Sequence, residues 1–386
     1  MTRRTPVARR VPLSLGPLAL ILVVLGGCGA GPSTKPSAPG LAPSAAPVAE
    51  ASPIAALEAA LPGSVGVATD TSGNLYLSQC ASDASLISRI DRHGELTPFA
   101  GAGPIGFSGD DGPALEATIG CPVGMAIGPD GALYFADHAN NRVRRIDQAG
   151  IITTIAGSGP AGVNQGSFSG DGGPATSATL QEPWDVAFDG KGNLFIADRD
   201  NHRVRRVDPG GVITTVAGDG TRRFAGDAGA AVSASLAAPL GIVVDTAGNL
   251  FIADSGNERV RMVSPDGVIS TYAGTGVKDS SGDGGPATSA AIEEPHDVAF
   301  DGAGAMLVST GGRIRRIDAD GIISTMAGAA GVGLPVDGIA ATKAHFGEVD
   351  GIAIDDAGNL FMADGYNSVY RIDPQGILTL FAGRRQ

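Results

Sequence analysis

Short runs of β-branched and aromatic residues alternate with polar turn residues from about residue 60 to the end of the chain. In residues 185–218 four such runs follow one another, DVAFD, NLFIAD, RVRRVD and GVITTVAG. The turns between them are rich in Gly and Asp. Runs of this composition, interrupted at this interval, are typical of strands joined by tight hairpins. We therefore predict four short antiparallel strands in this segment.

The four-strand pattern recurs along the chain. The stretch Gly192–Gly218, GNLFIADRDNHRVRRVDPGGVITTVAG, has counterparts at 131–157, 248–274 and 358–383, and weaker copies begin at Gly73 and Gly304. Each copy ends in Ala-Gly, and successive terminal glycines are 54 to 61 residues apart. Six four-stranded units at this period predict an all-β, six-bladed β-propeller with four antiparallel strands per blade.

The phase of the repeat predicts how the ring closes. The first unit begins with its first strand near residue 64, and the last unit ends with its fourth strand near residue 383. We therefore expect closure without an interlocking strand, unless residues 54–60 supply one; IAALEAAL, at 54–61, is more typical of a short helix. The propeller is placed at 57–386, with blades at about 61–103, 120–159, 180–220, 236–276, 292–330 and 346–385.

The consensus of these units, GNLxIADxxNxRVRRVxxxGxITTVAG, resembles the NHL repeat family. The connecting segments at 168–177 and 281–289 share Ser-Gly-Asp-Gly-Gly-Pro-Ala-Thr-Ser and are similar to those of bacterial NHL proteins and of the teneurin NHL domain. The resemblance covers residues 60–386 and implies the propeller fold. It does not imply one activity, because this fold serves adhesion modules, scaffolds, lyases and lactonases.

The first 56 residues have the composition of targeting and linker segments. Four arginines within residues 3–10 precede an apolar stretch, 11–25, that is short for a membrane span. Leu25-Gly26-Gly27-Cys28 resembles the bacterial lipobox, whose cysteine receives a diacylglycerol with acyl chains such as palmitate. We predict a lipoprotein signal peptide at 1–27, lipidation at Cys28 and a disordered Pro/Ala/Ser-rich tether at 28–56. An ordinary cleaved signal peptide is the alternative.

This leader predicts a location in the cell envelope, lipid-anchored on the extracytoplasmic side of a bacterial membrane. The formal net charge is −13, and removal of residues 1–27, which contain four Arg and no acidic residue, takes it to −17. Such a domain repels a phosphate backbone, so we expect no nucleic acid partner. We also expect a monomer. The paired arginines of the third strands, such as Arg205 and Arg206, should pack their stems between blades and place their heads in ion pairs.

Polar residues that recur in each unit are expected to be structural. The Asp-x-x-Asn turns, including His202 within one of them, and the aspartates of the Gly-Asp-Gly-Gly-Pro connections should cap their own turns. Binding of Ca²⁺ by the connection aspartates is the alternative. Within a blade the chain should run up and down, so that tight turns share one face and the long connections share the other. Because long loops commonly carry function, we expect the site on the long-loop face.

Residues that differ between units are the better functional candidates, and they gather where the first strands begin. First strands line the central channel of a propeller, so this position surrounds the channel mouth. Its acidic residues and histidines suit a cation or a small ligand, and the sole tryptophan suits a ring stacked on it. The candidate ligand-binding residues are Glu182, Trp184, Asp185, Glu294, His296, Asp297, His345, Glu348 and Asp350.

The sequence predicts no catalytic residue, because it pairs no nucleophile with a base, and it predicts no cofactor outright. Glu294, His296 and Asp297 are candidate ligands for a divalent cation, Ca²⁺ or Zn²⁺, against the simpler interpretation of an acidic rim with water in the channel. Cys80 and Cys121 end and begin strands of neighbouring blades, which makes them a candidate disulfide in an oxidising compartment.

Together these features predict a membrane-anchored binding or scaffold module that recognises a protein, peptide or carbohydrate through its long-loop face. The alternative function is a metal-dependent lyase or lactonase with its site at the channel mouth.

Overall fold

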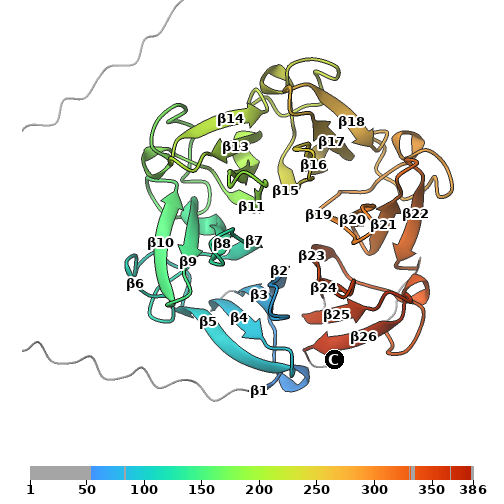
Figure 1. Cartoon of the computed structure of the whole chain (residues 1–386), viewed down its shortest axis with the longest axis horizontal. Coiled ribbons are helices and arrows are strands. Elements are labelled where there is room, and N and C mark those ends of the chain that lie inside the picture. Colours follow the sequence, from blue (N-terminus) through green and yellow to red (C-terminus); the bar gives the residue numbers. More distant parts are fainter. Residues whose placement is uncertain (1–53, 82–83, 330, 332–334, 366, 384–386) are drawn as a thin grey trace, which may run out of the picture. The chain divides into compact units, whose positions relative to one another are not determined.

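The computed structural model describes residues 54–81, 84–329, 331, 335–365 and 367–383. Within them six sheets form a ring around a central channel, and each sheet is one blade (Figure 1). Every blade is an antiparallel meander whose first strand lies at the channel and whose fourth lies at the rim. This confirms the predicted six-bladed β-propeller. The predicted signal peptide, Cys28 and residues 28–53 of the tether lie outside the described residues.

Each blade has four main strands. Blade 1 contains β2 (Ser64–Thr69), β3 (Leu75–Cys80), β4 (Ser85–Ile90) and β5 (Glu95–Gly103), and blade 2 contains β7 (Pro122–Ile127), β8 (Leu133–Asp137), β9 (Arg142–Ile146) and β10 (Ile151–Ala156). Blade 3 contains β11 (Pro183–Phe188), β12 (Leu194–Asp198), β13 (Arg203–Val207) and β14 (Ile213–Ala217), and blade 4 contains β15 (Pro239–Val244), β16 (Leu250–Asp254), β17 (Arg259–Val263) and β18 (Ile269–Ala273). Blade 5 contains β19 (Val298–Phe300), β20 (Met306–Thr310), β21 (Arg313–Ile317) and β22 (Ile323–Ala327), and blade 6 contains β23 (Val349–Ile354), β24 (Leu360–Asp364), β25 (Ser368–Ile372) and β26 (Leu378–Ala382).

Short single turns of 3-10 helix complete the described elements. The turns η2 (His138–Asn140), η4 (Arg199–Asn201) and η6 (Ser255–Asn257) join second and third strands, and η3 (Ala175–Ser177), η5 (Ala231–Ser233), η7 (Ala287–Ser289) and η8 (Ala341–Lys343) lie in the connections between blades. No helix in the described part of the chain is long and apolar enough to cross a membrane.

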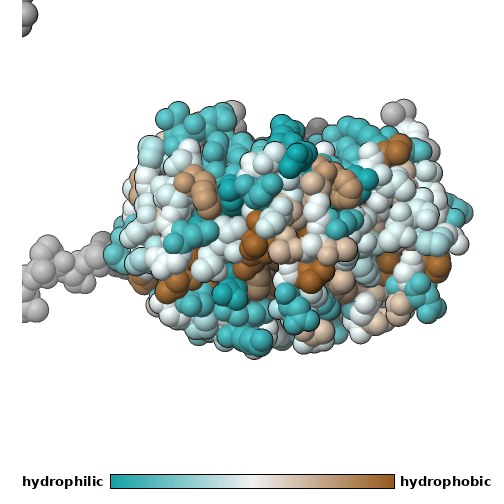
Figure 2. Space-filling model, turned by 90° about the horizontal axis from the view of Figure 1, so that it is seen from above, coloured by the Kyte–Doolittle hydropathy of each residue, from teal (hydrophilic) through white to brown (hydrophobic). Residues whose placement is uncertain are grey.

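Alternating side chains of the second strands explain how the blades pack. In β12, Leu194 and Ile196 face the core shared with blade 2, whereas Phe195 and Ala197 face the core shared with blade 4. Because the strand is covered on both faces, Leu194–Asp198 is buried throughout. This explains why four successive residues of the strand, Leu194 to Ala197, are apolar. Seen edge-on, hydrophilic residues gather towards both faces of the ring, and hydrophobic residues lie mostly in the band between them (Figure 2).

The N-terminal segment closes the ring by taking the place of a connection between blades. In the connection after blade 3, Ala231 accepts a hydrogen bond from Gly218 N and donates one to Gly267 O, at 3.0 and 2.8 Å. Ala56, in the 3-10 turn η1 (Ala56–Glu58), does the same with Gly383 of blade 6 and Gly94 of blade 1, both at 2.9 Å.

The two-residue strand β1 (Ile54–Ala55) pairs with β5 of its own blade, as β6 (Gly112–Pro113) pairs with β10 in blade 2. No described strand passes from one end of the chain into the blade at the other end, which confirms closure without an interlocking strand. The sheet of blade 1 begins at Ile54, ahead of the expected boundary at residue 57. The short helix expected at 54–61 is a single 3-10 turn.

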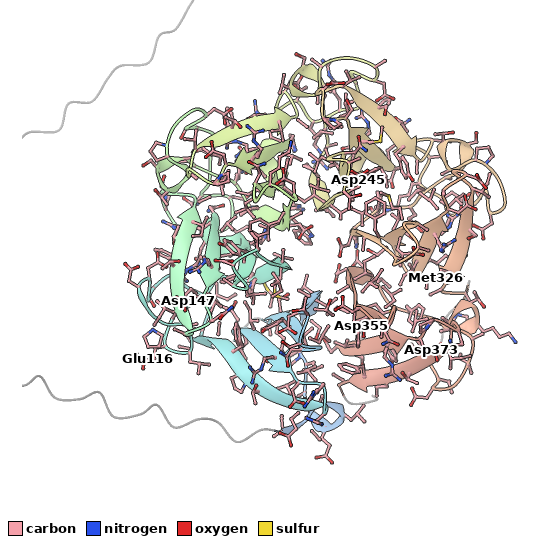
Figure 3. The ribbon with its side chains drawn as sticks, in the orientation of Figure 1. Glu116, Asp147, Asp245, Met326, Asp355 and Asp373 are labelled. Carbon is pink, nitrogen blue, oxygen red and sulfur yellow. A yellow bond between two sulfur atoms is a disulfide. The ribbon has the colours of Figure 1, made fainter. Side chains whose placement is uncertain are left out.

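Tight turns, most of them stabilised by an aspartate, occupy one face of the ring. Asp355 and Asp373, labelled in blade 6 in Figure 3, begin the turns after the first and third strands. The Oδ1 atom of each accepts two backbone N–H hydrogen bonds from its own turn, at 2.8 to 3.0 Å. Because the strands alternate in direction, the connections between blades lie on the opposite face, as expected.

Blades 2 to 5 each bury one third-strand arginine that ties the blade to the connection before it. In blade 3, Arg205 Nη2 lies 2.6 Å from Asp171 Oδ1 in the connection, and Arg205 Nη1 lies 3.3 Å from Asp198 Oδ2 at the end of β12. The Phe168 ring covers Arg203 and Arg205, with centroid distances of 3.9 and 4.7 Å. The equivalent arginines and connection aspartates are Arg144–Asp110, Arg261–Asp227 and Arg315–Asp283.

The arginines therefore behave as the sequence predicts, with packed stems and paired heads. The connection aspartates of blades 2 to 5 differ from the expectation, because they bind these arginines and do not simply cap their own Gly-Pro turns. The physical reason is that a buried guanidinium needs a carboxylate partner to offset the loss of its hydration.

Candidate functional site at the channel mouth

Irregular backbone at the start of the first strands directs side chains into the channel mouth. In blade 3 the pairing of β11 with β12 shifts register between Pro183 and Val186, which releases Trp184 and Asp185 from the ladder. Blades 1, 2, 4 and 6 have the same shift. A bulge of this kind bends the strand and changes the direction of its side chains.

In blade 5 the first strand begins later, at Val298, so His296 and Asp297 precede β19. Both residues are held by hydrogen bonds to Ser309 of the second strand. His296 N donates to Ser309 O and Asp297 N donates to Ser309 Oγ, both at 2.9 Å. The residue before the proline in blades 3 and 5 is also unusual, because Glu182 and Glu294 have φ values of 49° and 37° although neither is glycine. The bulge residues and their neighbours are therefore held in fixed directions by the blade beneath them.

An open pocket of about 370 Å³ lies at the mouth and is built from residues that differ between blades. Blade 3 and the connection after it contribute Trp184, Arg199 and Arg222 to one wall. The other wall is acidic and contains Glu258, Glu294, His296, Glu348 and Asp350. A second cavity, in the channel, has a volume of about 250 Å³ and is lined mainly by apolar first-strand residues. The polar chemistry of the channel is therefore concentrated at the long-loop end.

His296 is the most enclosed member of the acidic wall, with 8 % of its surface exposed. Its Nε2 atom lies 3.3 Å from Glu348 Oε1 and its Nδ1 atom lies 3.4 Å from Asp350 Oδ1. Burial opposes protonation of the ring, but the nearby carboxylate of Asp350, followed by those of Glu348 and Glu294, raises the pKa of His296 above its ordinary value. One ligand atom from each of His296, Glu348 and Asp350 lies within 4.8 Å of the others.

Asp185 and Asp297 lie deeper in the channel and join neighbouring blades. Asp185 Oδ2 accepts a hydrogen bond from Ile242 N of blade 4 at 2.9 Å, and Asp297 Oδ2 accepts one from Ile352 N of blade 6 at 2.8 Å. Burial, followed by the charge of Asp297, raises the pKa of Asp185 well above its ordinary value, and burial raises the pKa of Asp297 to about 6. Gly241, between them, has no room for a Cβ, which would overlap Asp297.

Glu182 is buried below the pocket and is occupied by other side chains and backbone. Its Oε1 atom accepts a hydrogen bond from Asn164 N at 2.8 Å, and its Oε2 atom lies 3.1 Å from Arg199 Nη1 and 3.7 Å from His138 Nε2. The Trp184 ring packs edge-on against His138, with 5.4 Å between centroids, and Arg199 lies 5.3 Å from the Trp184 centroid. Glu182 thus positions Arg199, which in turn supports the tryptophan.

Two other candidates depart from the prediction, His345 in its position and Glu294 in its bonding. His345 lies against Gly331 of the connection between blades 5 and 6 and does not line the mouth pocket. Glu294 does line it, but its carboxylate is 2.6 Å from Lys278 Nζ. The metal candidates Glu294, His296 and Asp297 are therefore not brought together as a set. The structure brings His296 together with Glu348 and Asp350.

Sequence reasoning missed His138, Arg199, Arg222 and Glu258. His138 and Arg199 occupy the same position of the repeated Asp-x-x-Asn turn, directly after its aspartate, where blade 4 has Ser255. The variation at this position was a usable signal, because the conspicuous Asp and Asn on either side of it repeat in blades 2 to 4. The repetition of the turn assigns it as a whole to the scaffold and hides this one variable position.

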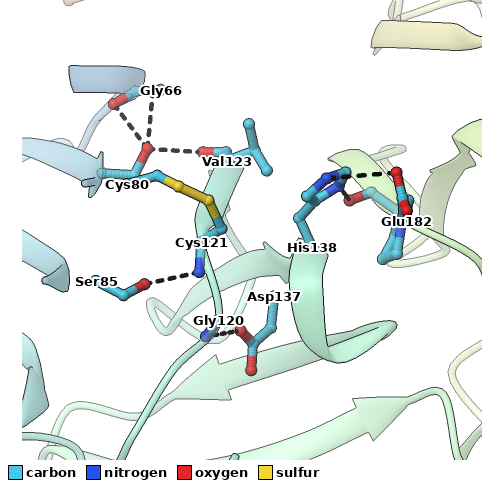
Figure 4. The surroundings of a disulfide bond; sticks show 11 residues. Gly66, Cys80, Ser85, Gly120, Cys121, Val123, Asp137, His138 and Glu182 are labelled. Carbon is cyan, nitrogen blue, oxygen red and sulfur yellow. Dashed lines mark hydrogen bonds and ion pairs between the residues drawn. A yellow bond between two sulfur atoms is a disulfide. The ribbon is translucent and has the colours of Figure 1, made fainter. Parts of the chain in front are cut away.

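Cys80 and Cys121 form a disulfide that joins blades 1 and 2 close to the mouth (Figure 4). Their Cα atoms are 4.6 Å apart. Beside them Ser85 Oγ accepts a hydrogen bond from Cys121 N at 2.7 Å (Figure 4). Ser78 Oγ donates a hydrogen bond to Val123 O at 3.0 Å. The sequence placed these two cysteines at adjacent strand ends on one face, and the structure bonds them there.

At four other interfaces a side chain that follows the second strand accepts a hydrogen bond from the next blade. In blade 3 the acceptor is His202 Nδ1, which lies 3.2 Å from Ala238 N. The equivalent acceptors and donors are Asn141 and Glu182 N, Glu258 and Glu294 N, and Asn367 and Gly63 N. Burial lowers the pKa of His202, which keeps this acceptor neutral. His202 is thus part of the scaffold, as expected.

A larger groove of about 750 Å³ lies between blades 3 and 4 at the tight-turn end. A similar groove of about 600 Å³ lies between blades 1 and 2 and is lined by the equivalent turns and strands. Because the feature recurs with the repeat, it follows from blade packing and is a weaker functional candidate than the mouth.

Comparison with known families agrees with this geometry. The teneurin NHL domain pattern matches residues 104–167, 219–281 and 273–334, and the NHL repeat pattern matches residues 180–207. The chain is an NHL-repeat β-propeller. These matches extend over blades 2 to 5.

Relatives match this NHL-repeat propeller over a small part of their own length. Teneurin-1 of Mus musculus is 29 % identical over 228 residues, which cover 54 % of this chain and 8 % of teneurin-1. Protein SUPPRESSOR OF QUENCHING 1, chloroplastic, of Arabidopsis thaliana is 31 % identical over 146 residues, which cover 37 % of this chain and 14 % of that protein.

Solved structures share the propeller at low sequence identity. A protein of unknown function from Bacteroides thetaiotaomicron has a TM-score of 0.60 at 19 % identity, covering 85 % of this chain and 72 % of that one. A gluconolactonase of Xanthomonas campestris has a TM-score of 0.53 at 16 % identity, covering 83 % and 88 %. A streptogramin B lyase has a TM-score of 0.51 at 14 % identity, covering 86 % and 87 %. These similarities establish the fold alone.

Proposed function

We propose that this NHL-repeat propeller is an extracytoplasmic binding module whose ligand docks at the channel mouth. One observation supports this above the others: the mouth pocket is lined by residues that differ between blades, whereas the repeated polar residues are engaged in turns, ion pairs and contacts between blades. Side chains that differ between blades are concentrated at this place, and it lies on the face with the long connections.

The two walls of the pocket suit a ligand with a flat or ring-shaped part and polar substituents. Trp184 offers an aromatic surface beside Arg199 and Arg222, and the opposite wall offers the carboxylates of Glu258 and Glu348. A sugar ring or an aromatic side chain stacks on tryptophan, while hydroxyl or ammonium groups bond to carboxylates. A carbohydrate, or a peptide segment with a basic residue, fits both walls.

Binding can be tested with Trp184 itself, because it is the only tryptophan of the chain. Residues 54–386 would be titrated with carbohydrate and peptide libraries while tryptophan emission is recorded. A ligand of the mouth should shift the emission, and Arg222→Ala should weaken its binding. Val212→Ala, at an exposed rim position, is the matched control and should bind as the wild type does. A ligand that binds both variants and the wild type equally, without changing the emission, would place the site elsewhere.

We also propose that Cys28 carries a lipid that holds the propeller at the outer side of the membrane. The support is the Leu-Gly-Gly-Cys motif after a short apolar stretch, followed by a Pro-rich tether. Metabolic labelling with a palmitate analogue should mark the wild type and not Cys28→Ser. If Cys28→Ser is labelled and sediments with membranes like the wild type, the anchor is not at this cysteine.

A lyase or lactonase is the second candidate function. The specific observation in its favour is the cluster of His296, Glu348 and Asp350 beside the open pocket, which has the ligand types of a metal site. A panel of lactones and of cyclic ester substrates, tested with added Mn²⁺ or Zn²⁺, checks it. Turnover that disappears in Asp350→Asn would favour the enzyme, and no turnover by wild-type protein with bound metal would exclude these substrates.

A further inference from the structure

We infer that His296, Glu348 and Asp350 form a binding site for one divalent transition-metal ion at the wall of the mouth made by blades 5 and 6. The inference goes beyond ligand binding at the mouth and does not depend on it, because the three residues come together whether or not an organic ligand docks. It also replaces the set expected from the sequence, Glu294, His296 and Asp297.

The spacing of the donor atoms fits a metal site. The ligand atoms lie within 4.8 Å of one another, and the His296 nitrogens lie 3.3 and 3.4 Å from the two carboxylates. Charge-assisted hydrogen bonds are shorter, at about 2.7–2.9 Å. Bonds of about 2.1 Å in a tetrahedral arrangement separate the ligand atoms by about 3.4 Å. His296 Nδ1 and Asp350 Oδ1 are thus spaced like two ligands of a shared ion. Glu348, which lies beside the other ring nitrogen, has to move to become the third ligand.

A buried, unpartnered nitrogen is the second and independent observation. His296 is 8 % exposed, and its Nδ1 atom is buried without a hydrogen-bond partner among the described residues. A buried polar atom without a partner is unfavourable, because it has given up its hydrogen bonds with water. The atom faces Asp350 at the edge of the pocket, so an ion bound there would satisfy it.

Neighbouring residues explain why the other sequence candidates are not ligands. Asp297 turns into the channel, where its carboxylate accepts hydrogen bonds from Val298 N and Ile352 N at 2.8 Å. Glu294 is paired with Lys278. Glu348, whose side chain is 58 % exposed, retains the freedom to close onto an ion that His296 and Asp350 hold from below.

The donor set selects the kind of ion. One imidazole nitrogen and two carboxylates suit Zn²⁺, Mn²⁺ or Fe²⁺, whereas Ca²⁺ and Mg²⁺ prefer oxygen ligands alone. Three protein ligands leave coordination positions open towards the pocket. An ion in this place would present those positions to oxygen atoms of whatever enters the mouth, opposite Trp184.

The test uses untagged protein stripped with EDTA and titrated with Mn²⁺ and Zn²⁺ by calorimetry, with Mn²⁺ also followed by electron paramagnetic resonance. The wild type should bind one ion per chain. His296→Ala and Asp350→Asn should each bind more than about 10-fold more weakly. His93→Ala, which removes an exposed histidine from a turn of blade 1, should bind like the wild type. Thermal melting of each apo variant checks that the propeller is intact.

Two results would overturn the inference. One is a wild type that binds no stoichiometric Mn²⁺ or Zn²⁺ at about 100 µM, a concentration well above the Kd expected of a structural or catalytic metal site. The other is an Asp350→Asn variant that melts like the wild type and retains its full affinity for the ion. Trp184→Ala separates this question from ligand docking, because it should keep the metal and lose the organic ligand.

Discussion

Replacing Arg205 by Met should destabilise the propeller by about 3 kcal/mol, at the low end of the range for breaking a buried ion pair. The Arg205 and Asp198 side chains are both fully buried, 3.3 Å apart. Without the guanidinium, Asp198 retains hydrogen bonds from Gln181 N and Asn201 Nδ2 but no opposite charge. The loss is limited because Asp198 can take up a proton, since burial already raises its pKa to about 6 in the intact protein.

The pH dependence of the loss of stability in Arg205→Met is a sharper prediction than the magnitude of that loss. Removal of Arg205 raises the pKa of Asp198 further above the value in the unfolded chain. A carboxyl whose pKa is raised by folding contributes stability that is present at low pH and lost as the pH rises through the folded pKa. The deficit of Arg205→Met relative to the wild type should therefore shrink as the pH is lowered from about 7.5 to about 5.5.

Urea and thermal unfolding at several pH values measure both quantities. A loss of about 3 kcal/mol corresponds to a fall in Tm of about 4 °C for a domain of this size. Asp171→Asn, which alters the partly exposed partner, should cost less than about 1 kcal/mol. The double variant Asp198→Asn/Arg205→Met should recover much of the stability. A single variant that loses less than about 0.5 kcal/mol, or loses the same amount at every pH, would refute the reasoning.

Three further predictions concern the contacts between blades. Replacing both Cys80 and Cys121 by Ala should cost about 4 kcal/mol by loop entropy, because the bond closes a loop with a sequence separation of 41; unchanged unfolding in urea would contradict this. His202→Asn, which copies blade 2, should remove the loss of stability that the wild type shows as the pH falls below the ordinary histidine pKa, since burial lowers the pKa of His202; parallel Tm–pH curves would contradict it. Gly241→Ala should cost about 1–3 kcal/mol by overpacking the channel, whereas Gly302→Ala, with no atom within 4 Å of the added Cβ, should melt like the wild type.

The fold was predictable because the same pattern of strand and turn residues recurs along the chain. Strand composition and the terminal Ala-Gly pair recur in all six units, and the four regular units identify the weaker copies that begin at Gly73 and Gly304. Ring closure was predictable in outline, but the part played by Ala56 was not. Its sequence context lacks the Gly-Asp-Gly-Gly-Pro signature, and only the hydrogen bonds with Gly94 and Gly383 identify it as a connection.

The candidate site was predictable where it depends on the first strands and not where it depends on turns. Trp184, Glu294, His296, Glu348 and Asp350 line the pocket, because a position at the start of a first strand always lies at the mouth. Glu182 and His345 occupy neighbouring positions, but local backbone direction turns them under the adjoining connections. The direction of a side chain beside a bulge depends on φ and ψ, which spacing alone does not give.

The two arginines of the pocket show a second limit of sequence-based prediction. Arg199 follows a repeated aspartate, and Arg222 lies in a connection, so neither stands near the first strand in sequence. They reach the mouth because the long-loop face folds over it. Chain topology brings them there, and no local pattern in the sequence carries that information.

The most direct test of the central claim is a single ligand titration followed by Trp184 emission, carried out with the wild type and with Arg222→Ala. If function resides in the non-repeating residues of the mouth, the wild type binds one ligand per chain with a saturable change in emission, and Arg222→Ala binds it more weakly. A ligand bound with unchanged Trp184 emission and with equal affinity by both proteins would contradict the claim and move the site away from the channel mouth.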